Sequence, residues 1–330
     1  MIINQTPFRI SFAGGGTDLP AFYRSEDYGA VVSTAIDKFV YLAIHRYFDR
    51  KFLLKYAQTE LCERIEDIRH PLIRECLRTA GTTDFLEITS FADIPSHGSG
   101  LGSSSSFTVG LLRALYAQRG RQTTAEECAA MACEVELERL GEPIGRQDQY
   151  AAAYGGLNYL RFLPDGKVEV EPITMPQGAL ARLAGRLMLF YTGVTRQAGE
   201  ILHEQGRNLG LDAARRENAR AMRGQADVLR AALVAGESEA LGAVLHEGWE
   251  RKRRMASGVS SPEFDALYAR ARAAGATGGK LLGAGGGGFF LFDVAPERQA
   301  AVRAALAELR EVPFGFEPKG TRVIYAGNFS

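Results

Sequence analysis

The chain has 330 residues, of which 46% are hydrophobic and 24% are charged, so disordered, collagen-like and coiled-coil proteins are excluded. Its 39 basic and 39 acidic side chains cancel at pH 7, which removes the long-range positive field of a non-specific nucleic-acid or polybasic membrane binder. This length is typical of roughly two globular domains.

The ends of the chain and its cysteines indicate an intracellular compartment. The N-terminus has no basic and apolar secretory pattern, and no apolar run reaches the length of a membrane-spanning helix. The cysteines form no CxxC pair and stand at Cys62, Cys76, Cys128 and Cys133. We therefore expect buried, reduced thiols in a cytoplasmic protein without nucleic-acid or membrane partners; a homodimer is left open.

The first predicted strand leads into three glycines. Alternating apolar residues at positions 8, 10 and 12 predict a strand with Arg9 and Ser11 on its opposite face. The segment 14–18, Gly-Gly-Gly-Thr-Asp, then forms either a tight turn capped by Asp18 or part of a binding site. A dinucleotide-binding turn is disfavoured because Leu19 stands where a third glycine belongs.

Further strands are predicted over 42–48 and 85–91, before a second glycine-rich segment over 98–106 that runs into a predicted helix at 103–118. Exposed backbone N–H groups, serine hydroxyls and a helix N-terminus suit such a loop to a polyphosphate. The segment lacks the Gly-Lys-Ser/Thr of a Walker A loop, and Ser103 breaks the GxGxxG pattern. A serine-rich linker is the alternative, but the regular apolar stripe that follows favours a phosphate loop.

A helix is also predicted over 125–140, ending before Gly141. It carries Glu134, Glu136 and Glu138, and alternate positions of an α-helix cannot share one face. At most two of these carboxylates can therefore point to one site. Asp148, which follows, is either a helix cap or a functional acid.

The second half of the chain has a different pattern, and we place a domain boundary near residue 182, which gives domains 1–182 and 183–330. The order predicted beyond it is a strand at 187–191, helices within 196–274, a strand at 289–294, a helix at 296–310 and a strand at 321–325. This order suits an α+β layer of helices on an antiparallel sheet. Seven glycines between 278 and 288 indicate backbone that closely approaches a ligand or another loop.

Three motifs in this order, PFRISFAGGGTD, GSGLGSSSS and KLLGAGGGGF, together resemble the GHMP kinase superfamily of ATP-dependent small-molecule kinases. Within it, GGGTDLP, GEPIGRQDQYAAAYGG and GGKLLGAGGGGFF look most like the kinases of heptose 7-phosphate. The resemblance implies a two-domain α+β GHMP kinase fold, with a ribosomal protein S5 domain 2-like N-terminal domain and a ferredoxin-like C-terminal domain. It also implies phosphorylation of the anomeric C1 hydroxyl of the sugar phosphate.

The resemblance implies roles for individual residues on the nucleotide side. Asp148 matches the catalytic aspartate, and Arg9 lies where relatives carry a cation near the transferred phosphoryl group. Ser104 and Glu136 would hold Mg²⁺, with Glu134 and Glu138 as alternatives to Glu136. The ATP phosphate loop would consist of Gly98, Ser99, Gly100, Leu101, Gly102, Ser103, Ser104 and Ser105, although two residues, 96 and 97, precede it where the common pattern has one.

On the acceptor side, Asp18 matches the ligand of sugar hydroxyls in galactokinase-like members. Arg196 and Lys252 are our candidates for holding a phosphate group of the acceptor, which needs a cation of its own. Backbone contacts to the substrate are expected from Gly15, Gly16, Thr17, Gly285 and Gly286. A kinase for a galactose- or fucose-like sugar and a catalytically silent sugar sensor are the alternatives.

Overall fold

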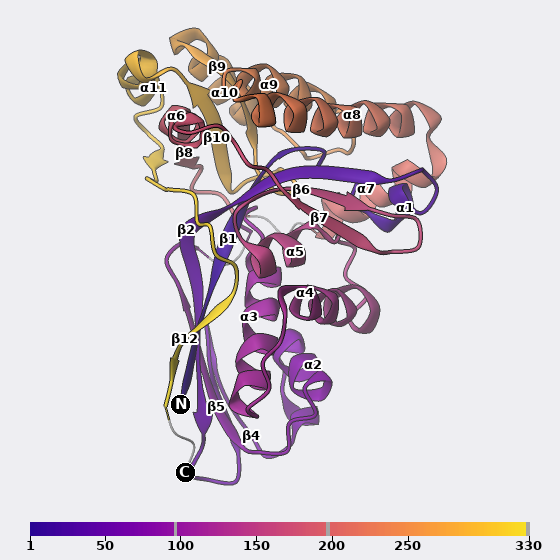
Figure 1. Cartoon of the computed structure of the whole chain (residues 1–330), viewed down its shortest axis with the longest axis vertical. Helices are drawn as coiled ribbons and strands as arrows, with labels where there is room; N and C mark the ends of the chain where they lie inside the picture. The colour runs from indigo at the N-terminus through magenta and orange to yellow at the C-terminus, as the bar shows by residue number, and fades with distance from the viewer. Residues whose placement is uncertain (96–97, 196–198, 328–330) are drawn as a thin grey trace.

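The computed structural model describes residues 1–95, 98–195 and 199–327, and it contains two β-sheets with helices packed on them (Figure 1). The first sheet consists of β1 (Ile2–Ala13), β2 (Gly29–Arg46), β3 (Phe52–Lys55), β4 (Thr59–Cys62), β5 (Leu86–Ala92), β6 (Leu157–Phe162), β7 (Val168–Pro172) and β12 (Arg322–Ala326). The second consists of β8 (Leu187–Tyr191), β9 (Ala276–Leu281), β10 (Phe289–Val294) and β11 (Arg310–Glu311).

The strand order is β12-β1-β2-β5-β3-β4 in the first sheet, where β6 pairs with β2 and with β7. In the second sheet the order is β11-β8-β10-β9. The strand pairs of both sheets are antiparallel except β3 and β5. The predicted α+β class is therefore confirmed, as are the strands at 187–191 and 289–294.

The helices of the first half are α1 (Pro20–Tyr23), η1 (Ile65–Asp67), α2 (Pro71–Thr79), α3 (Ser103–Gln118), α4 (Ala125–Cys133), η2 (Glu134–Arg139) and α5 (Gln147–Tyr154). In Figure 1, α2, α3, α4 and α5 lie on one side of the long first sheet, whereas α1 lies beside α7. Those of the second half are α6 (Ala179–Arg186), α7 (Gly199–Leu211), α8 (Ala213–Ala235), α9 (Ala240–Lys252), α10 (Pro262–Ala274), η3 (Pro296–Arg298) and α11 (Gln299–Ala305). None of the helices described is long and apolar enough to cross a membrane.

The predicted helix at 125–140 changes its winding halfway. Thr124 and Glu127 form a reciprocal capping box that starts α4. After Cys133 the chain continues as the π-helix η2, which ends just before Gly141. A π-helix has a wider turn than an α-helix and is frequently found at functional sites, so α-helical spacing does not describe the positions of the three glutamates here.

The two sheets are joined by a continuous apolar layer. Phe8, Ile10 and Phe12 of β1 are at most 1% exposed, as the predicted strand alternation requires. They belong to one cluster with Leu229 of α8 and Leu245 of α9. A second core lies within the first sheet and α2 to α5, and a third within the second sheet, α9 and α10. The shared layer holds the end of β1 against the second half of the chain.

Strand β9 was not predicted, because its glycines lower strand propensity. In the structure they allow close packing: a Cβ at Gly278 would lie 1.8 Å from the backbone oxygen of Gly242 in α9. The helix predicted at 296–310 is shorter, since α11 ends at Ala305 and β11 begins at Arg310. All four cysteines are buried and free, as expected.

The last strand of the chain returns to the first sheet. β12 pairs with β1, with Ile2 opposite Ala326 and Gln5 opposite Arg322. The N- and C-terminal regions therefore lie together at one end of the molecule (Figure 1). The boundary near residue 182 stays a prediction, and the segment that carries β12 crosses it in space.

Candidate active site

The predicted phosphate loop precedes α3, which begins at Ser103 as the sequence predicts. Gly98, Gly100 and Gly102 have φ values of 61°, 75° and 80°, a left-handed conformation that favours glycine. The hydroxyls of Ser99 and Ser103 are 2.7 Å apart and close the loop. Because the first turn of a helix leaves its N–H groups unpaired, the start of α3 suits a phosphate group.

The second glycine-rich loop packs directly on this phosphate loop. A Cβ at Gly283 would lie 2.4 Å from the Cα atom of Gly100, and one at Gly288 would lie 2.4 Å from the backbone oxygen of Ser99. Side chains at these positions would push the two loops apart. The close backbone approach predicted for 278–288 is confirmed, and the neighbour is the phosphate loop itself.

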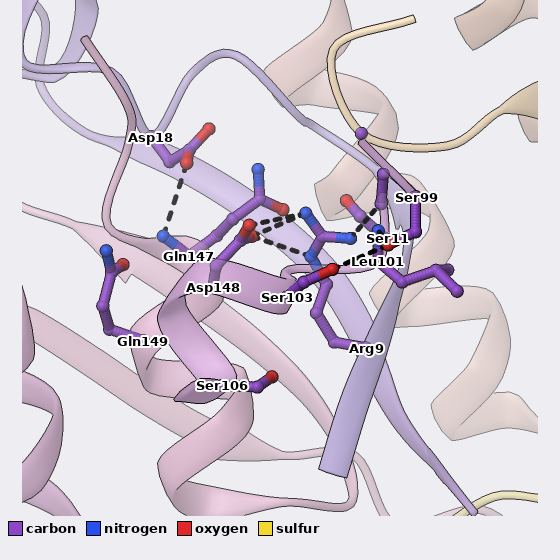
Figure 2. A network of polar contacts seen from close by, with 12 residues as sticks. Arg9, Ser11, Asp18, Ser99, Leu101, Ser103, Ser106, Gln147, Asp148 and Gln149 are labelled. Atoms are coloured by element: carbon purple, nitrogen blue, oxygen red, sulfur yellow. Dashed lines mark hydrogen bonds and ion pairs between the residues drawn. The ribbon is translucent and has the colours of Figure 1, made fainter. Parts of the chain in front are cut away.

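Arg9 and Asp148 form a bidentate ion pair next to the loop (Figure 2). Arg9 Nε donates to Asp148 Oδ1 and Nη2 donates to Oδ2, both at 2.7 Å. Arg9 Nη1 also donates to the backbone oxygen of Gly100 at 2.7 Å, and the Arg9 N–H donates to that of Leu101 at 3.0 Å. The guanidinium therefore connects the acid on the first turn of α5 to the phosphate loop, in the paired geometry that fixes both groups.

Asp18 lies on the other side of the first turn of α5. Its carboxylate accepts hydrogen bonds from the N–H groups of Gly16, at 2.9 Å, and Gln147, at 3.3 Å. A Cβ at Gly145 would lie 1.9 Å from Asp18 Oδ2, so glycine is needed there to make room for the carboxylate. Burial, and next the negative charge of Asp148, raise the pKa of Asp18.

Glu136 is the buried member of the three glutamates. Glu134 pairs with Arg139 at 2.7 Å, and the Glu138 side chain is 63% exposed. Glu136 is 1% exposed, and its Oε2 accepts a hydrogen bond of 2.7 Å from Gln149 Nε2. Burial raises the pKa of Glu136 to about 7, although Gln149 and the neighbouring hydroxyls of Ser105 and Ser104 favour its charged form.

The residues around Glu136 fit a magnesium ion. The groups around its carboxylate are neutral, namely the Gln149 amide and the hydroxyls of Ser105 and Ser104, and Ser104 is exposed. Among the described residues no group of three His, Cys, Asp or Glu side chains could hold a metal. Mg²⁺ usually takes one or two protein oxygens and completes its shell with water and phosphate oxygens, so one carboxylate and one hydroxyl suffice.

Two buried lysines complete the charges of the site. Lys252, at the end of α9, is 7% exposed and donates to the backbone oxygen of Gly283. Its burial, and next the charges of Lys280 and Arg9, hold its pKa well below the ordinary value, while Asp18 and Asp148 oppose this. These neighbours place Lys252, predicted to hold a phosphate group of the acceptor, near the Arg9–Asp148 pair.

Lys280, in β9, is a site residue to which the sequence reasoning gave no role. It is 6% exposed, and its Nζ donates to the backbone oxygen of Ser11 at 3.1 Å. Burial and the charge of Arg9 lower its pKa to about 8. A lysine that opens a glycine-rich motif was the available signal. Gln149, which holds Glu136, was likewise given no role.

The remaining acceptor-side residues lie in different places. Gly15 and Gly16 lie in the turn before α1, where added Cβ atoms would come within 4 Å of the Ser11, Gln147 and Gln205 side chains. Thr17 is buried and supports the turn, because its hydroxyl donates to the backbone oxygens of Gly14 and Ala30. The second-loop glycines lie against the backbone of Val259, to which the Gly286 N–H donates at 2.9 Å and which a Cβ at Gly285 would approach within 2.5 Å. Arg196, like residues 96 and 97, lies outside the described residues.

Comparison with known proteins identifies the family. Residues 41–156 match the model of the GHMP kinases N terminal domain, and residues 229–312 match that of the GHMP kinases C terminal domain. A curated D-glycero-alpha-D-manno-heptose 7-phosphate kinase of Campylobacter jejuni is 31% identical over 92% of this chain and 93% of its own length. A galactokinase of Pyrococcus furiosus is 26% identical over 96% of this chain and 95% of its own length.

A solved structure agrees with these matches. The crystal structure described as a D-glycero-D-manno-heptose 1-phosphate kinase from Bacteroides thetaiotaomicron superposes with a TM-score of 0.81 at 26% identity. The match covers 99% of this chain and 100% of that one. The chain therefore belongs to the GHMP kinase family and is an ATP-dependent kinase.

Proposed function

We propose that this kinase transfers the γ-phosphoryl group of ATP to the anomeric C1 hydroxyl of D-glycero-D-manno-heptose 7-phosphate. The observation that carries the proposal is the Arg9–Asp148 pair, held at 2.7 Å next to the phosphate loop and near Asp18 and Lys252. The heptose is supported by the curated relative from Campylobacter jejuni, with which this chain shares 31% identity over nearly its full length.

On the nucleotide side, the residues of the loop 98–105 bind the phosphates through backbone N–H groups and hydroxyls. Ser104 and Glu136 would hold Mg²⁺, which when bound neutralises charge on the phosphate oxygens during transfer. Arg9 provides a fixed positive charge where the phosphoryl group passes. Since phosphoryl transfer requires mainly alignment and charge neutralisation, these groups cover the donor half of the reaction.

On the acceptor side, Asp148 accepts the proton of the attacking hydroxyl. An anomeric hydroxyl is more acidic than an ordinary alcohol, so a carboxylate is a sufficient base. Arg9 holds both oxygens of Asp148 in place and keeps the carboxylate aimed. Asp18 binds another hydroxyl of the sugar, and Lys252 neutralises phosphate charge at the catalytic pair.

Asp148→Asn tests the assignment of the base. We expect kcat to fall by about a hundredfold or more, because the variant loses the proton acceptor, while ATP binding is nearly unchanged. The matched control is Asp227→Asn, a half-buried carboxylate bound by Tyr28 and Tyr159 instead. Unchanged kcat in Asp148→Asn, measured with heptose 7-phosphate and Mg²⁺–ATP, would remove Asp148 from the mechanism.

A kinase for an unphosphorylated galactose- or fucose-like sugar is the second candidate, favoured by the 26% identity to a galactokinase. The two candidates differ in the need for a cation that binds the acceptor's own phosphate. Removal of the phosphate from the acceptor distinguishes them, because unphosphorylated heptose has a higher KM than heptose 7-phosphate only if the kinase binds that phosphate. Turnover of galactose or fucose well above the heptose phosphate selects the second candidate.

A further inference from the structure

Buried polar atoms without partners gather around the glycine turn that follows β1. Ser11 Oγ, Gln147 Oε1 and Gln205 Nε2 are buried and have no hydrogen-bond partner. A Cβ at Gly15 would lie 3.6 Å from Ser11 Oγ and 3.9 Å from Gln147 Nε2. One at Gly16 would lie 3.8 Å from Gln205 Oε1. The three side chains, from β1, α5 and α7, thus meet around the Cβ positions of these two neighbouring glycines.

Two of these side chains are almost completely enclosed. Ser11 is 5% exposed and Gln205 is 3% exposed. A buried donor or acceptor without a partner destabilises a fold, and such groups are rare in proteins unless a ligand or water completes them. The fold itself therefore offers no reason for an amide at position 205, where an apolar side chain of equal size would cost less.

We infer that Ser11, Gln147 and Gln205 form the hydroxyl-binding wall of the acceptor pocket and determine which sugar the kinase accepts. This inference rests on the proposed function and extends it. Figure 2 shows Gln147 beside Asp148 on α5, and Ser11 is two residues beyond Arg9 on β1. The wall therefore adjoins the catalytic pair, where the ring of an acceptor must lie when its reacting hydroxyl meets Asp148.

The chemistry of the wall selects a neutral polyol. An amide offers both a donor and an acceptor, and a serine hydroxyl can act as either. Sugar hydroxyls also do both, so they can satisfy all three groups at once. A carboxylic acid fits poorly, because Asp18 and the oxygen of Gln147 would face its negative charge. The wall thus binds ring hydroxyls that do not react, and a missing hydroxyl leaves a protein group unpaired.

Gln205→Leu tests the inference, with Ser11→Ala as a second variant. Both remove a polar atom that has no partner in the free protein, so we expect the thermal midpoint of the free protein to be unchanged or higher. The matched control is Gln225→Leu, which removes another buried amide from the second half of the chain. Gln225 lies against α9 instead, since a Cβ at Gly248 would lie 3.4 Å from its Oε1.

The assay measures kcat and KM with heptose 7-phosphate, galactose, fucose and their monodeoxy analogues. We expect Gln205→Leu to raise the KM of the preferred sugar by roughly ten- to a hundredfold, with the KM for ATP and the acceptor-independent hydrolysis of ATP unchanged. We also expect the ratio of kcat/KM between the preferred sugar and one of its deoxy analogues to fall in the variant. A merely structural role of Gln205 would not change this ratio.

The outcomes separate the inference from the proposed function. If the unchanged protein phosphorylates none of these sugars, both the proposed function and the inference are refuted. Turnover of a sugar with the same KM and the same deoxy-analogue ratio in Gln205→Leu and Ser11→Ala refutes the inference alone. An equal rise of KM in the Gln225→Leu control assigns the effect to packing and also refutes it.

Discussion

Glu136→Gln should make the free protein more stable above neutral pH while it abolishes the metal-dependent reaction. The substitution keeps an oxygen that accepts the hydrogen bond from Gln149 and removes only the charge. In the nucleotide-free protein this charge is buried, and the hydrogen bonds that the described residues give it come from an amide and from hydroxyls. Under the proposed function, the residue serves ligand binding at the expense of the fold, a common trade-off at active sites.

The magnitude follows from the pKa of Glu136, which burial raises from 4.5 to about 7. Since the folded pKa is the higher one, the folded state binds more protons between these values, and stability falls as pH rises from 4.5 to 7. Between pH 5 and pH 8 this amounts to about 2 to 3 kcal/mol. For a chain of this length it lowers Tm by about 3 to 4 °C.

The assay compares melting of the unchanged protein and Glu136→Gln in EDTA at pH 5 and pH 8. Other titrating groups are common to both proteins, so only the difference between them matters. Glu60→Gln is the matched control. Burial acts to raise the pKa of Glu60, but hydrogen bonds from Tyr56 and from the backbone of Arg69 and His70 lower it overall. That charge stabilises the fold above pH 4.5, so the control should melt lower at pH 8. Parallel pH dependence of the unchanged protein and Glu136→Gln would refute the reasoning.

Two further results are expected from the same geometry. Gly145→Ala adds a methyl group 1.9 Å from Asp18 Oδ2, so the acceptor KM should rise about tenfold or more. The control Gly224→Ala, where an added Cβ has nothing within 4 Å, should leave the kinetics unchanged. Equal effects of the two variants would contradict the role of the carboxylate. Burial lowers the pKa of Lys280 from 10.5 to about 8, so the stability of the protein should rise as the pH rises from 8 to 10.5. The measurement is the Tm at both pH values. An equal rise of Tm in a Lys280→Met variant would show that this lysine is not the cause.

Features carried by local pattern could be predicted from the sequence. The glycine-rich turn and the start of α3 at Ser103 were predicted correctly, because left-handed backbone and a helix N-terminus depend on nearby residues. The same holds for β8 and β10, whose apolar runs are buried on both faces. The close approach at 278–288 followed from glycine content alone, although the neighbour it contacts did not.

Features that depend on tertiary packing could not be predicted. α-helical spacing could not select Glu136 among three glutamates, because η2 winds as a π-helix. Gln205 carries no local signal, and α7 comes beside the glycine turn only when the second half of the chain packs on β1. The charge environment of Lys252 depends on the same packing, so its nearness to the Arg9–Asp148 pair could not be read from local sequence.

The return of β12 to the first sheet has a consequence for the order in which the protein is made. β1 leaves the ribosome long before its partner on one side, β12, because most of the sequence lies between them. The hydroxyls of Thr6 and Thr321 are buried and 2.8 Å apart across this late pairing. Until β12 arrives, one edge of β1 is open to pairing with another chain, so association of nascent chains through this edge competes with folding.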